Sequence, residues 1–299
     1  MKSIGRRNND VDAQKPAGST SAALQSDSAW IRALTNRRRL LIIWGVTVVA
    51  AAAVFAVPPI PQDPGYHTFA DRRAILGLPN FFDVVSNAPF LLVGVLGFIL
   101  LAGNHRSPGG APFVHKSEKL PYAVLFLGLA LTTFGSGYYH LAPDNGRLVW
   151  DRLPMTLVFV SFVAAAITER ISVKLGLIAL LPLIVAGVGS VIYWQATERA
   201  GAGDLRPYVI VQFYSMLLII LIMLLFSSRY TRSGDVAVVL VLYGLSKAFE
   251  LLDKKIFALG GVISGHTLKH LAAGLAAYWI WRMLRKRHPV VALLRRVAT

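Results

Sequence analysis

The dominant pattern along the chain is a series of apolar runs of about 20 residues, separated by short polar segments. A helix needs about 20 mostly apolar residues to cross the hydrocarbon core, where every backbone polar group must be bonded internally. The pattern therefore predicts an all-α, polytopic transmembrane bundle. Its eight expected spans are residues 40–57, 80–101, 121–140, 151–168, 173–193, 207–227, 235–252 and 262–284.

The polar segments between these spans divide the chain. Residues 1–40 are polar and basic and predict a disordered cytoplasmic tail, and residues 41–57 predict an N-terminal membrane anchor. An extracytoplasmic loop at 58–79, a seven-helix domain at 80–284 and a basic cytoplasmic tail at 285–299 complete the expected organisation. Val54-Phe55-Ala56 resembles a signal-peptidase site, but the apolar run and the tail before it are longer than usual, which favours an uncleaved anchor. Pro154 is expected in the first turn of its span, where proline is tolerated.

Composition and charge agree with this class. Only 15% of the residues are charged, against about 25% in soluble domains. The net charge of +16 is explained by cytoplasmic Lys and Arg and by attraction to anionic lipid, and no nucleic-acid-binding module is visible. Placing most Lys and Arg inside gives cytoplasmic termini and puts His140, Asp151 and His266 near the outer face. The chain has no cysteine, which excludes disulfides and thiolate metal ligands.

Candidate chemistry lies at the ends of three of the expected spans. Ser136 and His140 stand four residues apart, as do His266 and His270, so each pair shares a helix face. Ionisable groups within a membrane mark functional sites by default. Three histidines with one open position form a ligand set of catalytic zinc sites, so we predict that His140, His266 and His270 bind zinc. A lone buried histidine could instead bond a backbone carbonyl.

The neighbouring polar groups have two interpretations each. Asp151 could carry a proton from an attacking water to a leaving nitrogen, or it could hydrogen-bond a ligating histidine. Ser136 could bond a developing oxyanion, or it could be a small packing residue between two glycines. Lys247, Glu250 and Asp253 are most simply an internal ion-pair cluster. The remaining histidines are expected in solvated loops or tails; they are His67, His105, His115 and His288.

These residues resemble the alkaline ceramidases, within the CREST superfamily of membrane hydrolases. The similar pieces are Ser86-Asn87, Gly135-Ser136-x-x-Tyr139-His140, Asp151-x-Leu153-Pro154-Met155 and His266-x-x-x-His270, in order across residues 80–284. The resemblance implies zinc bound by the three histidines, and Asp151 and Ser136 assisting hydrolysis of a ceramide amide. The extra first span, Leu40 to Val57, lies outside the seven-helix core of the family. The loop from Tyr66 to Asp71 is more similar to the bacterial branch, which implies a bacterial inner membrane. Animal members also bind calcium through an acidic cluster before their first core helix; here that region offers Asp71, and Asn80 stands where an acidic ligand is expected, which does not favour calcium.

Three further functions compete with a lipid amidase. One is a zinc-containing lipid-binding or receptor-like protein without significant turnover. Another is a retinal protein with Lys269 or Lys247 as the Schiff base, which leaves the paired histidines unexplained. The third is a proton-coupled transporter that relays protons through Lys247, Glu250 and Asp253, although no inverted repeat is visible.

Overall fold

The computed structural model describes residues 18–103 and 112–290, with side chains from residue 36 onward. No β-strand occurs in these residues, so the predicted all-α fold class is confirmed. The α-helices are α1 (Gly18–Ala56), α2 (Phe81–Val85), α3 (Ala88–Ala102), α4 (Lys119–Leu141), α5 (Asn145–Arg170), α6 (Val173–Arg199), α7 (Arg206–Val209), α8 (Ser215–Leu225), α9 (Asp235–Leu251), α10 (Asp253–Ala258) and α11 (Gly265–Lys286). A π-helical segment, Ile210–Tyr214, joins α7 to α8.

Two compact units make up the chain, residues 1–46 and residues 47–299. α1 begins in the first unit and ends in the second. Residues 18–40 were expected to belong to a disordered tail, and the structure differs, because α1 already begins at Gly18. No proline or glycine interrupts residues 19–44, so nothing in that stretch breaks a helix. The expected tails at residues 1–17 and 291–299 lie outside the described residues.

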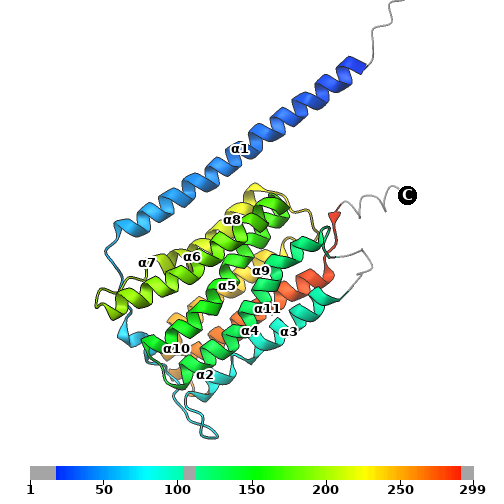
Figure 1. The fold of residues 1–299 in the computed structure, drawn as a ribbon. Helices are drawn as coiled ribbons and strands as arrows, with labels where there is room; N and C mark the ends of the chain where they lie inside the picture. Colours follow the sequence, from blue (N-terminus) through cyan, green and yellow to red (C-terminus); the bar gives the residue numbers. More distant parts are fainter. Residues whose placement is uncertain (1–17, 104–111, 291–299) are drawn as a thin grey trace, which may run out of the picture. The chain divides into compact units, whose positions relative to one another are not determined.

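The second unit contains a bundle in which the long helices run side by side (Figure 1). α5 packs between α4 and α6, and α11 packs against α9 and α3. Fully buried apolar side chains such as Phe126, Ile219 and Leu284 fill the space between these helices. Among the described residues, six helical segments are long and apolar enough to cross a membrane: 36–56, 81–102, 116–141, 145–170, 173–199 and 206–225. The chain is therefore consistent with a multi-pass membrane protein, and α9 and α11 remain predicted spans.

Two helices differ locally from the expected spans. The second span is divided into α2 and α3, with Pro89 in the first turn of α3. The fourth begins at Asn145 instead of 151, because the Asp144 side chain caps it by accepting a hydrogen bond from the Arg147 backbone N–H at 2.8 Å. The expectation for Pro154 was therefore wrong: this proline lies inside α5, where it removes one backbone hydrogen bond.

Candidate metal site

Helix ends that carry the candidate chemistry meet at one end of the bundle, which we call the histidine end. α4 ends there one residue after His140, and α2, α5 and α11 begin there (Figure 1). The first two turns of α11 contain His266 and His270, and the second turn of α5 contains Asp151. Three helices distant in sequence thus bring the candidate residues to one place.

The three histidines form a buried cluster. His140, His266 and His270 are 1%, 4% and 4% exposed, and one nitrogen from each ring lies within 4.8 Å of the others. The Nε2 atoms of His140 and His266 are 3.3 Å apart. Two nitrogens at about 2.0–2.1 Å from a tetrahedral ion are separated by about 3.3–3.4 Å, so this spacing fits two ligands of one metal. The cluster could hold a metal ion.

Hydrogen bonding around the rings also fits a metal site. Ser86 Oγ lies 2.8 Å from His270 Nδ1 and so orients that ring, leaving its Nε2 directed elsewhere. The Nδ1 atom of His140 has no hydrogen-bond partner among the described residues, and its Nε2 has only the 3.3 Å contact to His266. That contact is longer than a normal hydrogen bond. The protein therefore leaves His140 incompletely satisfied, as expected of an imidazole that binds another ligand.

The first turn of α11 is fixed from two sides. The Ser264 side chain caps it by accepting from the Thr267 backbone N–H at 3.0 Å. Asp253 Oδ1 accepts from the His266 backbone N–H at 2.8 Å, and its Oδ2 accepts from the Ala70 backbone N–H at 2.9 Å. Asp253 was interpreted as a member of an ion-pair cluster, and this was wrong. Its carboxylate instead bonds backbone groups and holds the segment that carries His266.

Ser136 and Asp151 both face the interior next to the histidines, at 1% and 5% exposure. The Asp151 carboxylate lies within interaction range of the Ser136 hydroxyl and the Lys269 ammonium. Close contact of α4 with α5 makes this arrangement possible, because a Cβ added at Gly135 would lie only 2.0 Å from the Trp150 carbonyl oxygen. A Cβ at Gly137 would meet nothing within 4 Å. The packing role considered for Ser136 therefore belongs to Gly135.

A loop covers the histidines from outside the bundle. The ring of Phe69, which is 6% exposed, lies 4.7 Å from the ring of His140 and 4.5 Å from that of His266 between centroids. His67 fixes this loop, because its Nδ1 lies 2.9 Å from the Tyr139 hydroxyl and its Nε2 lies 2.9 Å from Asn145 Oδ1. His67 was expected to be solvated, and it is instead half-buried and bonded on both sides. Phe69 thus shields the cluster from water.

Asp71 and Asn80, the two residues considered for calcium binding, both form hydrogen bonds to other parts of the protein. Asp71 accepts two hydrogen bonds from the Arg73 side chain, which lower the pKa of its carboxyl group from the usual value. Arg73 also donates to the Val262 carbonyl at 2.7 Å. The Asn80 amide donates to the backbone carbonyl of His140 at 2.7 Å. These contacts tie the loop and α2 to the helices that carry the histidines.

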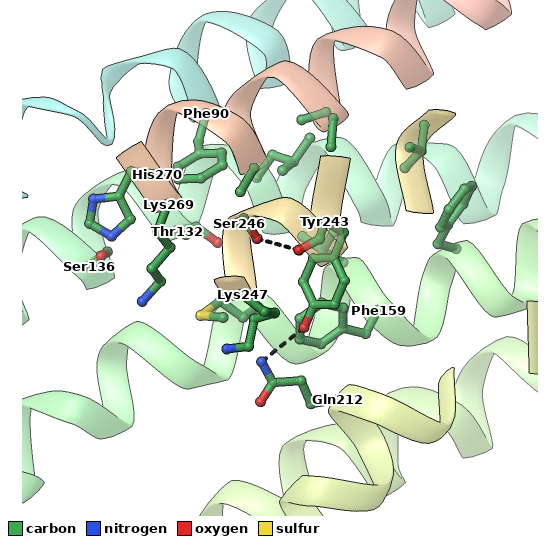
Figure 2. Close-up of a pocket in the computed structure, with 18 of the residues that line it drawn as sticks. Phe90, Thr132, Ser136, Phe159, Gln212, Tyr243, Ser246, Lys247, Lys269 and His270 are labelled. Carbon is green, nitrogen blue, oxygen red and sulfur yellow. Dashed lines mark hydrogen bonds between the residues drawn. The ribbon is translucent and has the colours of Figure 1, made fainter. Parts of the chain in front are cut away.

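A long pocket extends from the histidine cluster into the bundle. Its polar end contains His270, Ser136, Asp151 and Lys269. Figure 2 shows His270, Ser136 and Lys269 toward one side, with Phe159 and Tyr243 farther along. The body of the pocket is mostly apolar; its lining includes Phe90, Leu129, Met155, Val158, Phe162, Met216, Val239, Ala273, Ala277 and Ile280.

The pocket follows the helix faces that carry the chemistry. On α11 it continues from His270 to Ile280, ten residues along one face, which corresponds to about 15 Å. This length is about half of the hydrocarbon core of a bilayer, which is about 30 Å thick. A mostly apolar pocket of this length, ending at polar groups, suits an alkyl chain with a polar end.

Two buried lysines share one carboxylate beside the pocket. Lys269 Nζ lies 2.7 Å from Glu250 Oε1, and Lys247 forms a shorter ion pair with Glu250 Oε2. The Tyr66 hydroxyl donates to Glu250 at 3.3 Å, and burial raises the pKa of Tyr66 well above its usual value. Lys269 Nζ also lies 3.5 Å from His266 Nε2. From the sequence these lysines were expected to form a Schiff base, an ion pair or a proton relay.

No model of a protein family matches the chain, and no curated protein matches it. The resemblance to alkaline ceramidases therefore rests on the quoted motifs alone. Ser86 belongs to the quoted motifs, but the sequence did not assign it a role. Its position in the polar start of an apolar span was the signal that could have suggested a role in the site. Phe69 had no comparable signal, because its contact with the histidines depends on how the loop folds back. His105 lies outside the described residues.

Proposed function

We propose that this protein is an intramembrane zinc-dependent hydrolase that cleaves the amide bond of an N-acyl lipid, ceramide or a similar compound. One observation carries the proposal. Three buried imidazoles at metal-ligand spacing lie next to Ser136 and Asp151, at the polar end of a pocket shaped for an alkyl chain. A lipid placed in this pocket by its chain would present its amide to the residues at the polar end.

The ligand set favours zinc as the metal. Imidazole is a good zinc ligand, and the chain offers no thiolate. His140, His266 and His270 would hold the ion, which leaves a position open for chemistry. When bound, zinc would supply Lewis-acid activation of the amide carbonyl and of the attacking water.

The chain's own residues would handle the proton and the developing charge. Asp151 takes a proton from the attacking water as the new C–O bond forms, and it returns that proton to the nitrogen as the C–N bond breaks. The Ser136 hydroxyl donates a hydrogen bond to the carbonyl oxygen as negative charge develops there. Phe69 excludes bulk water, which strengthens the electrostatic interactions within the site. The products are a fatty acid and an amine.

The direct test is turnover by the purified full chain. Zinc-loaded protein in detergent is incubated with ceramides and other N-acyl lipids, and the released fatty acid is measured by mass spectrometry. We expect release that depends on zinc and that stops in the His266→Ala variant. A protein that binds these lipids without releasing fatty acid would instead be the lipid-binding or receptor-like alternative.

The Asp151→Asn variant separates the two roles of this residue. If Asp151 is the general acid–base, the variant should hydrolyse the lipid about 10²–10⁴-fold more slowly while zinc stays bound. If Asp151 only orients a ligating histidine, the same change should weaken zinc affinity by about 10–100-fold, and excess zinc should restore activity. Unchanged turnover with full zinc would remove Asp151 from the mechanism.

A further inference from the structure

The strongest unexplained feature of the pocket is its pair of lysines. Lys247 and Lys269 both line the pocket, and their ammonium groups meet at the two oxygens of Glu250. Their side chains are only 24% and 11% exposed. Charged groups at membrane depth are costly unless they are paired. Glu250 is thus the direct partner of two largely covered cations.

The surroundings add further positive charge. Asp151 is the one carboxylate among the described residues that line the pocket; it lies within interaction range of Lys269, and in the proposed reaction it exchanges a proton. Arg152, which is 5% exposed, lies behind the site over the rings of Trp194 and Tyr208 and donates to Gln62 at 2.6 Å. A divalent metal on the histidines would add two more positive charges. With Glu250 and Asp151 counted against the two lysines, Arg152 and a divalent metal, positive charge is in excess around this end of the pocket, and a neutral head group would leave it uncompensated.

We propose that the substrate is an N-acyl lipid with an acidic head group, such as an N-acyl amino acid, and that Lys247 and Lys269 bind its carboxylate. This inference rests on the proposed hydrolase function. In an N-acyl amino acid only the nitrogen and one carbon separate the scissile carbonyl from the carboxylate. Lys269 Nζ lies 3.5 Å from His266 Nε2, so it is close enough to the metal site to bind a carboxylate that follows the reacting carbonyl this closely. Lys247 lies on the adjacent helix α9 and supplies the second cation.

A matched pair of lipids tests the head-group charge. N-palmitoylglycine and N-palmitoylethanolamine share the acyl chain and differ mainly by a carboxylate in place of a neutral alcohol. For the zinc-loaded full chain we expect kcat/KM to be at least about tenfold higher for the glycine conjugate. The Lys247→Met variant should bring this ratio close to one, while Lys247→Arg should keep a ratio above one. Lys255→Met, an exposed lysine on α10 outside the pocket, should leave the wild-type ratio unchanged.

Equal turnover of the two lipids by the wild type would overturn the inference while leaving the hydrolase in place. An unchanged ratio in Lys247→Met would also overturn it, and the zinc content of that variant verifies that it is folded. Binding supplies a second readout, measured as thermal stabilisation of the zinc-free protein by N-palmitoylglycine and by N-palmitoylethanolamine. N-palmitoylglycine should stabilise the wild type more than N-palmitoylethanolamine, and Lys247→Met should remove the difference. If no lipid is hydrolysed but this difference is found, the anion site stands and the hydrolase fails.

Discussion

At the end of the bundle opposite the histidines, where α5 and α11 finish, Glu169 pairs with the fully buried Arg287. We call this the arginine end. The guanidinium also donates to the Pro112 carbonyl at 3.0 Å and lies 4.1 Å from the ring of Tyr230, measured to the centroid. Glu118 accepts a hydrogen bond from Tyr230 and lies 3.7 Å from the Arg229 guanidinium. None of these side chains lines the pocket.

Both ends leave some polar atoms of ionisable groups without a partner among the described residues, including Arg287 Nη2 at the arginine end. At the histidine end two lysines share Glu250, and His140 Nδ1 and one oxygen of the fully buried Asp83 lack a partner among the described residues. These groups lie around or beside a pocket rather than inside closed packing. The comparison suggests a criterion. A buried charge at membrane depth is a functional candidate when its pairing is incomplete next to a cavity, and a structural one when its partners enclose it.

Removing a histidine should produce the largest effect and mark the histidine end as functional. We expect about one zinc per chain in the wild type and almost none in His140→Ala, His266→Ala or His270→Ala, measured by elemental analysis. His115→Ala, an exposed histidine just before α4, should keep its zinc. Undiminished zinc in all three cluster variants would show that the cluster is not the metal site.

Removing Arg287 should instead affect stability. Arg287→Met leaves Glu169 buried without its cation, which typically costs about 3–5 kcal/mol. Thermal unfolding should show a large loss, while the folded fraction keeps its zinc. The double variant Arg287→Met/Glu169→Gln should be more stable than Arg287→Met, because no unpaired charge remains. Arg285→Met, at an exposed position, should unfold like the wild type. Loss of zinc from folded Arg287→Met would contradict the separation of the two ends.

The glycines of α4 sharpen the comparison within the histidine end. Gly135→Ala places a methyl group against the Trp150 carbonyl and should push α4 away from α5, at a cost of about 1–3 kcal/mol. Turnover should fall as well, since Ser136 and Asp151 lie on these two helices. Gly137→Ala meets open space and serves as the control, with unchanged turnover and with stability equal to the wild type or higher by up to about 1 kcal/mol, because alanine favours a helix over glycine. Equal effects of both changes would mean that helix propensity, not close packing, governs this segment.

The sequence predicts the helical class and the histidine cluster well, because both depend on local rules. A run of about 20 apolar residues indicates a membrane-spanning helix, and i,i+4 spacing places His266 and His270 on one helix face. The start of α5 was misplaced because the long apolar run begins after Asp151, whereas Asp144 caps the helix two turns earlier. The cap signal was present in Asp144-Asn145-Gly146, but hydropathy outweighed it.

Contacts between distant segments could not be predicted in the same way. Phe69 over the histidines and Asp253 bonded to Ala70 join a loop to helices nearly 200 residues away. Nothing in the local spacing of these residues encodes that pairing. The Lys247–Glu250 pair is three residues apart and could be expected, but the bond from Lys269 to the same carboxylate depends on how α9 packs against α11.

The smallest expected effect concerns a closed ion pair in the loop between α6 and α7, and it tests whether the pairing criterion also holds outside the helices. Asp204 is 2% exposed and accepts two hydrogen bonds of 2.8 Å from the Arg206 guanidinium, which lower the pKa of its carboxyl group to about 2. The unfolded chain has an ordinary aspartate pKa of about 3.9. Because the folded pKa is the lower one, the pair's stabilisation is fully present above about pH 4 and is lost as the pH falls toward 2. Asp204→Asn should therefore unfold at a lower temperature than the wild type at pH 7, and this difference should shrink between about pH 4 and 2. Comparing wild type and variant at each pH cancels the loss of metal that acid also causes. A difference that stays constant with pH would show that the carboxylate's charge does not stabilise this loop.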